Sequence, residues 1–222
     1  MRLKHLNFLI ALMLIVGGFL SVVAQQPTEK EIRKLLTDSR SSDRKLSDSA
    51  GETLSKLDAS SVPALISILK KGNPCDQVAA ARYVIDLAPN NADVVPTMTK
   101  VARGASLRTI FHLQEEMICR RGAAYVLAFS ADGIVVLKQL LKEGDTWEKQ
   151  SAIFALDDLT EVANYPNGSI PTMKEVIPEI AKATKARDEV LSEMAEEVLG
   201  QIARGPNKEL SDLAKSYLTP GR

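Results

Sequence analysis

The chain repeats one helical pattern, in which a small residue is followed by large apolar residues four and seven positions later. In the stretch QVAAARYVIDL, Ala80 is followed in this way by Val84 and Leu87. Residues at this spacing share one face of an α-helix, and the small residue lets a neighbouring helix approach closely. The same register begins at four more positions, which are Ala50, Gly122, Ala152 and Ala195.

A second apolar run follows each of these helices after a polar turn. Two examples are VPALISILKK and VVPTMTKVA, in which proline stands near the start of the run. Proline suits the first turn of a helix because its missing N–H has no helical partner there. No long stretch alternates apolar and polar residues as a half-buried strand would. The sequence therefore predicts an all-α fold built from helical hairpins.

The five small residues are 30, 42, 30 and 43 positions apart. Helical hairpins of about this length stack into α-solenoids, because one hairpin cannot bury its apolar face alone. The stretches CRRGAAYVLAFSADGIVVLKQLL and QVAAARYVIDLAPNNADVVPTM resemble HEAT-like repeats, in particular the short repeats of phycobilisome lyases. The resemblance implies a right-handed α-solenoid of about five hairpins that acts as a non-enzymatic interaction scaffold.

Two of the intervals between repeats are longer and contain insertions. We expect residues 104–116 to extend the next helix backwards or to add a short helix. Residues 160–173 are expected to form a long loop, in which the PNG sequence starting at Pro166 is a strong turn signal. Long loops often carry function, so Tyr165 is a candidate contact residue.

The N-terminus has the pattern of a secretory signal peptide. Two basic residues, Arg2 and Lys4, precede an apolar run over residues 6–20, and small residues follow it. We expect cleavage between Ala24 and Gln25, which would place the exported protein in the periplasm or outside the cell. A membrane anchor that is not cleaved is the alternative.

The rest of the chain has two expected parts after the signal peptide at residues 1–24. Thr28 and Glu31 have the spacing of a helix capping box, so residues 25–42 are expected to form an N-terminal capping helix and a linker. Residues 43–222 are expected to form the HEAT-like repeat domain.

Histidine is too scarce for most enzyme chemistry. Of the two histidines, His5 lies in the expected signal peptide, so the mature chain keeps only His112. A catalytic triad would have to use this residue, and a site with several histidine ligands is excluded. A metal site can be drawn from His112, Cys119 and the glutamates between them, but a solvated polar ridge fits better because spacing alone is weak evidence. We therefore predict no catalytic residue, no cofactor and no metal.

The two cysteines are candidates for a disulfide. Cys75 lies five residues before Ala80, and Cys119 lies three residues before Gly122. On equivalent helices these positions differ by about 200° around the axis, which can bring the sulfur atoms of neighbouring helices together. Export to an oxidising compartment makes the bond feasible. Two buried free thiols are the alternative.

Basic residues gather on the second helices of the hairpins, whereas the first helices carry an acidic excess. The resemblance implies that the second helices line a concave face, which we expect to bind a protein or an anionic envelope polymer. Lysines at helix C-termini also offset the helix macrodipole, and this is the simpler explanation of their positions. The candidate partner-binding residues are Lys70, Lys100, Arg103, Lys138, Lys142 and Lys182.

The leading hypothesis is an exported, non-enzymatic interaction scaffold without a membrane segment after signal cleavage. The chain has 28 basic and 28 acidic residues, whereas nucleic-acid binding needs a concentrated positive surface, so nucleic acid is not an expected partner. Two alternatives remain open: an envelope enzyme of unknown reaction, and a membrane-tethered module that retains its signal anchor.

Overall fold

The computed structural model describes residues 27–104, 113–161, 165–166 and 168–218. Within these ranges all regular secondary structure is α-helix or 3-10 helix, which confirms the all-α class. None of the helices within these ranges is both long and apolar enough to cross a membrane. The expected cleavage site at Ala24 and Gln25 lies outside the described residues, and so does His112.

Most of the helices follow one another with short connections, and α3 packs against α2. A single 3-10 turn, Ala59–Ser61, precedes the fourth helix. In chain order the α-helices are α2 (Glu29–Asp38), α3 (Arg44–Leu54), α4 (Val62–Lys71), α5 (Pro74–Leu87), α6 (Val94–Ala102), α7 (Leu113–Ala128), α8 (Ala131–Glu143), α9 (Thr146–Glu161), α10 (Ile170–Ala183), α11 (Glu189–Arg204) and α12 (Lys208–Leu218).

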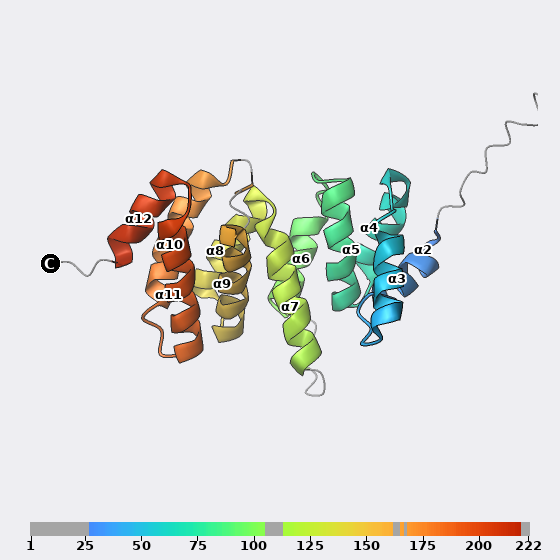
Figure 1. Cartoon of the computed structure of the whole chain (residues 1–222), viewed down its shortest axis with the longest axis horizontal. Coiled ribbons are helices and arrows are strands. Elements are labelled where there is room, and N and C mark those ends of the chain that lie inside the picture. Colours follow the sequence, from blue (N-terminus) through green and yellow to red (C-terminus); the bar gives the residue numbers. More distant parts are fainter. Residues whose placement is uncertain (1–26, 105–112, 162–164, 167, 219–222) are drawn as a thin grey trace, which may run out of the picture.

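Most of the helices lie in two rows that run along the molecule, from α2 at one end to α12 at the other (Figure 1). The inner row consists of α5, α7, α9 and α11, and each of these helices packs against the next one in the row. The outer row consists of α4, α6, α8 and α10, with the same kind of contact. Helices adjacent in the chain, such as α7 and α8, pack across the rows.

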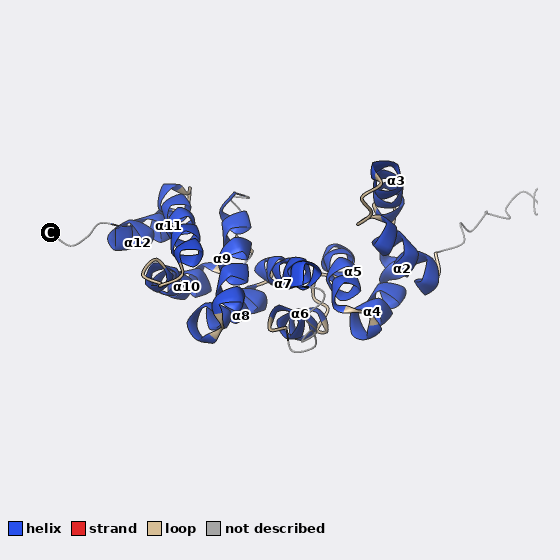
Figure 2. Cartoon of the chain, turned by 90° about the horizontal axis from the view of Figure 1, so that it is seen from below, coloured by secondary structure: helices blue, strands red, loops and turns tan. Residues whose placement is uncertain are grey.

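The two rows bend into an arc, with α5 and α7 on its inner side and α4, α6 and α8 on its outer side (Figure 2). The expectation that the second helix of each hairpin lines the concave side is therefore wrong. Neighbouring helices of the inner row pack more extensively in total than those of the outer row, and the more closely packed row lies inside the curve. Gly122 contributes to this packing, because a Cβ built there would lie only 2.8 Å from Cγ1 of Val78.

One continuous apolar core runs between the rows, and three of the five repeated small residues belong to it. Ala80, Ala152 and Ala195 are fully buried, as is Val84 one turn after the first of them. Phe129 departs from the pattern because its side chain is 40% exposed. Helix α7 ends at Ala128, and the Phe129 N–H bonds to the carbonyl three residues back, which turns its side chain away from the core.

Local signals position several helix ends as expected. Thr28 and Glu31 form the predicted capping box at the start of α2, where the Thr28 N–H donates to the Glu31 carboxylate at 2.7 Å. Proline stands in the first turn of α4 and of α10. The second insertion is shorter than the expected loop, because α9 continues to Glu161 and α10 begins at Ile170. Its turn is present, since Gly168 has a φ of 77°.

The first insertion lengthens the helix that follows it, and Tyr165 of the second insertion is partly buried. Helix α7 begins at Leu113, inside the first insertion, so this segment does lengthen the following helix; residues 105–112 lie outside the described ranges. Tyr165 packs against the core instead of projecting from the surface, and this burial raises the pKa of its phenol.

Candidate functional site

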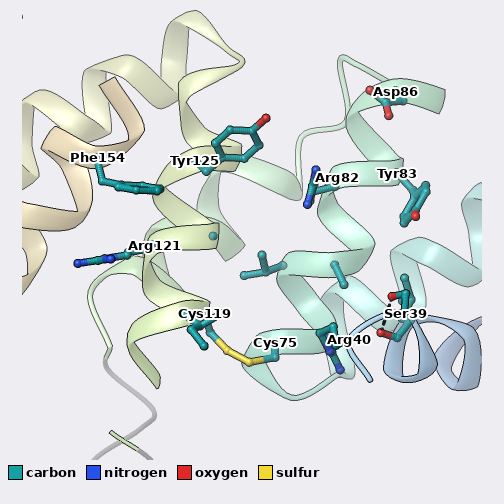
Figure 3. A pocket seen from close by; sticks show the side chains of 15 residues that line it. Ser39, Arg40, Cys75, Arg82, Tyr83, Asp86, Cys119, Arg121, Tyr125 and Phe154 are labelled. Carbon is teal, nitrogen blue, oxygen red and sulfur yellow. Dashed lines mark hydrogen bonds between the residues drawn. A yellow bond between two sulfur atoms is a disulfide. The ribbon is translucent and has the colours of Figure 1, made fainter. Parts of the chain in front are cut away.

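A pocket of about 740 Å³ opens on the inner row, between α5 and α7, with contributions from the end of α2 and from α9 (Figure 3). This volume lies within the range of pockets that bind small ligands or short peptide segments. We call this pocket the inner groove. Its charged and aromatic lining residues are Arg40, Arg82, Tyr83, Asp86, Arg121, Tyr125 and Phe154.

A disulfide closes one end of the inner groove. Cys75, in the first turn of α5, is bonded to Cys119 of α7, and their Cα atoms are 5.1 Å apart. This separation lies in the usual range for a disulfide. The pairing that the sequence left open is therefore present in the structure, and it fixes α5 against α7.

Gly122 lies one turn further along α7 and allows the same close packing. A Cβ at this position would come within 2.8 Å of the Val78 side chain on α5, which is closer than ordinary van der Waals contact. The glycine and the disulfide thus act together to bring the two helices that form the inner groove close to each other.

Two arginines lie over aromatic rings in the inner groove. The guanidinium carbon of Arg82 is 5.4 Å from the centre of the Tyr125 ring, and that of Arg121 is 5.2 Å from the centre of the Phe154 ring. Both distances suit a cation–π interaction. The Tyr125 ring also makes an edge contact with Phe129, with ring centres 4.8 Å apart. These contacts hold the rings and the guanidinium groups in place across α5, α7 and α9.

Apolar side chains are exposed on the same side of α7 and α9. Ile118 is 67% exposed, although its neighbour Cys119 is buried. Phe154 on α9 is also exposed. Clustered apolar side chains on the surface of a soluble protein mark sites of interaction more often than isolated ones do. The inner groove therefore offers apolar contact as well as positive charge.

The arginine beside the disulfide, Arg40, has a different role (Figure 3). Arg40 Nη2 donates to Oδ1 of Asp76 at 2.6 Å, and Arg33 approaches the other carboxylate oxygen at 3.5 Å. Asn73 also donates to Asp76, at 2.8 Å. Because Asp76 is buried and needs these partners, this cluster stabilises the junction between α2 and α5.

Tyr83 lies on α5 near the charged side chains of Arg82 and Asp86. Burial raises the pKa of its phenol, and the neighbouring Asp86 carboxylate raises it further, whereas Arg82 lowers it. The net shift is upward, so the phenol keeps its proton at neutral pH and can donate a hydrogen bond to a ligand.

The basic residues expected at the partner interface do not line the inner groove. They belong to the outer row or directly follow one of its helices. Most stand in a last helical turn, where positive charge offsets the helix macrodipole, so helix-end electrostatics accounts for their positions. They are Lys70 in α4, Lys100 and Arg103 at the end of α6, Lys138 and Lys142 in α8, and Lys182 in α10.

Four of these six side chains also have a carboxylate partner, which reduces the positive field they present to solvent. Two of the pairs join different elements: Lys70 bonds to Asp93 at 2.9 Å, and Lys138 bonds to Glu175 of α10. The outer row is therefore a surface of largely compensated charge. The other two pairs are Lys142 with Glu143 and Lys182 with Glu179.

Across the described ranges, no group of three or more histidine, cysteine, aspartate or glutamate side chains is placed to hold a metal ion. His112, a ligand of the metal site considered from the sequence, lies outside those ranges. Cys119, a second ligand of that site, is bonded to Cys75.

Sequence reasoning missed the groove residues Arg82, Arg121, Tyr125 and Phe154. A signal for two of them was present on α7, where Arg121 and Tyr125 recur with Ile118 at helical spacing opposite the buried stripe. An exposed face that carries aliphatic and aromatic residues every three or four positions departs from the usual polar surface of a helix.

The sequence matches no model of a known protein family, and no curated protein matches it significantly.

Proposed function

We propose that the chain is an exported, non-enzymatic interaction module, and that its partner binds in the inner groove. The observation that carries this proposal is the groove itself, where exposed apolar side chains of α7 and α9 stand beside arginines held on aromatic rings. Exposed aromatic and arginine side chains are the residue types most enriched at protein–protein hot spots.

We further propose that the architecture is a right-handed α-solenoid of about five HEAT-like hairpins. The two parallel rows of helices support this, and so does the recurrence of the same small residue in successive helices of the inner row. A stack of this kind presents a long curved surface, which is suited to binding an extended partner.

Export is supported by the disulfide and by the N-terminal sequence. Disulfides persist in oxidising compartments and are rare in the cytosol. N-terminal sequencing of the protein purified from the producing cell tests this part of the proposal. A mature start at Gln25 is expected, whereas an intact N-terminus would favour the tethered alternative.

Recognition is favoured over turnover by the groove lining. Arg82 and Arg121 lie over aromatic rings, Arg40 is bonded to Asp76, and the two cysteines are bonded to each other. A broad hydrolase screen addresses the enzyme alternative. Turnover that is lost on one point substitution in the groove would contradict the proposal.

Partner capture from an envelope extract tests the location of the site. A variant with Tyr125→Ser and Phe154→Ser should lose the partner, because both rings line the inner groove. A matched control carries Lys100→Glu, Lys138→Glu and Lys142→Glu on the outer row and should retain it. Loss of the partner in the control but not in the groove variant would return the site to the lysines.

A further inference from the structure

We propose that the inner groove recognises a protein segment in which acidic residues stand beside an apolar side chain, an inference that rests on the proposed function and specifies its ligand. Two arginines with available charge, the apolar surface between them and their order along the groove define such a ligand.

Arg82 and Arg121 carry positive charge that no carboxylate of the described residues neutralises. Among the described residues, neither guanidinium has a carboxylate within the 4.0 Å that defines an ion pair. Arg40 provides the contrast within the same pocket, because its guanidinium is bonded to Asp76 at 2.6 Å. The two available arginines therefore set the charge that a ligand meets.

Their contacts with aromatic rings leave them able to bind a carboxylate. An arginine stacked on a ring still presents the N–H donors along its edge, and these match the two oxygens of a carboxylate. The rings also hold each guanidinium in one place, which reduces the entropy lost on binding. A carboxylate is the most suitable ligand group in a protein partner.

The surface between the two arginines is apolar. Figure 3 shows the Tyr125 ring between Arg82 on one side and Arg121 with Phe154 on the other. Ile118, three residues before Arg121 on the same face of α7, adds an exposed aliphatic side chain. A ligand that bonds both arginines must therefore lay apolar groups across this surface.

Asp86 gives the ligand a direction. This exposed carboxylate lies one turn beyond Arg82 on α5, at the edge of the inner groove away from Arg121. It repels an acidic side chain at that edge. The carboxylates of the ligand are thus restricted to the two arginines, with the apolar side chain between them.

A peptide fits this lining better than other anionic polymers do. Nucleic-acid binding depends on neutralising many phosphates, and the groove offers only two available guanidinium groups. The exposed aliphatic surface at Ile118 stabilises an apolar side chain, which a polyanionic sugar or phosphate backbone does not supply. These polymers enter the test as competing ligands.

A peptide-display selection on the oxidised, full-length exported protein tests the inference. A random-peptide library is selected against it, and the enriched peptides are synthesised with a fluorescent label and titrated by polarisation. The expected consensus has acidic residues on one or both sides of an aliphatic or aromatic residue. Replacing the acidic residues of the peptide by their amides should weaken binding about tenfold for each charge removed.

Variants of the protein then locate the charges. Arg82→Gln and Arg121→Gln should each weaken binding about tenfold, and the double variant more strongly. Arg103→Gln, at the end of α6 on the outer row, is the matched control and should leave binding unchanged. Binding should also weaken as the salt concentration rises, since exposed charge contacts are screened. An unchanged circular dichroism spectrum shows that each variant is folded.

The outcomes separate the inference from the proposed function. Enriched peptides that lack acidic residues, yet lose binding to the Tyr125→Ser and Phe154→Ser variant, overturn the inference and leave the proposed function standing. Peptides that bind every variant equally, or a selection without enrichment, overturn both. Heparin or a single-stranded oligonucleotide that binds more tightly than any peptide, with the same dependence on Arg82 and Arg121, overturns the assignment to a protein segment.

Discussion

Arg40 donates a hydrogen bond from Nη2 to Oδ1 of Asp76 at 2.6 Å, across 36 positions of sequence. The bond joins the segment after α2 to the first turn of α5. The Asp76 side chain is only 6% exposed, and Asn73 and Arg33 supply its other contacts. This carboxylate therefore connects the N-terminal helix to the inner row.

Asp76→Asn is expected to lower the free energy of unfolding by about 2 kcal/mol, because a hydrogen bond between charged groups contributes about 1.5–3 kcal/mol. The matched control is Asp48→Asn, which removes a pair with Arg44 at 3.7 Å whose side chains are both exposed. The control should change stability by less than about 0.5 kcal/mol. Urea unfolding midpoints compare the two, and equal losses would contradict the role given to Asp76.

The disulfide makes a larger contribution to stability. Replacing both Cys75 and Cys119 by alanine should lower the free energy of unfolding by about 4 kcal/mol, through the chain entropy regained by the unfolded state. The bond spans 44 positions of sequence, which sets this value. Wild-type protein treated with a reductant should unfold like the double variant. Two reactive thiols in protein freshly purified from the envelope would contradict the bond.

Gly122→Ala tests the close packing of α5 and α7. Alanine in a helix normally stabilises by about 0.5–1 kcal/mol relative to glycine, and Gly51→Ala in α3 should show this gain because nothing lies within 4 Å of the new Cβ. At Gly122 the new methyl group meets Val78, and overpacking of this kind costs about 1–3 kcal/mol.

The two glycine substitutions should therefore differ in sign, with Gly51→Ala raising the thermal midpoint and Gly122→Ala lowering it. Adding Val78→Ala to Gly122→Ala removes the methyl group that clashes and should restore part of the loss. If both glycine variants are stabilised alike, the helices are not in close contact at this point.

Tyr83 should make the protein less stable at alkaline pH. Its pKa is raised above the ordinary value of 10.0, chiefly by burial, so the folded state keeps the phenol proton at a pH where the unfolded chain loses it. The stability from this residue is present below that value and is lost as the pH rises through the folded pKa.

Tyr83→Phe should flatten the fall in stability above this pH, since phenylalanine does not titrate. Chemical unfolding followed on both sides of the ordinary tyrosine pKa measures the slope. Tyr165 contributes with the same sign, because burial raises its pKa as well, so Tyr165→Phe is a second variant with a similar expected effect. Identical slopes for the wild type and both variants would contradict this assignment.

The helices and their buried faces could be predicted from the sequence because both depend on local spacing. Ala80 and Val84 are buried as the pattern indicates, and the capping box at Thr28 forms as its spacing predicts. The direction of the curve could not be predicted in this way. It depends on contacts between different helices, such as that of Gly122 on α7 with Val78 on α5.

The groove was missed because charges were counted over whole helices. The first helices have an acidic excess in total, yet Arg82 and Arg121 stand on the faces that line the inner groove. The pairing of the cysteines stayed open for a related reason. The rotation of α7 about its axis depends on the insertion that precedes it, and the sequence does not specify that rotation.

The Cys75–Cys119 bond closes a covalent ring that contains α6 and nearly all of α5. A pulling force applied to the two ends of the chain crosses this ring through the sulfur atoms, so residues 76–118 carry no tension while the bond is intact. A protease that cuts once within the ring leaves both halves joined. Reduction releases the whole ring at once, and the chain then gains its full contour length under load.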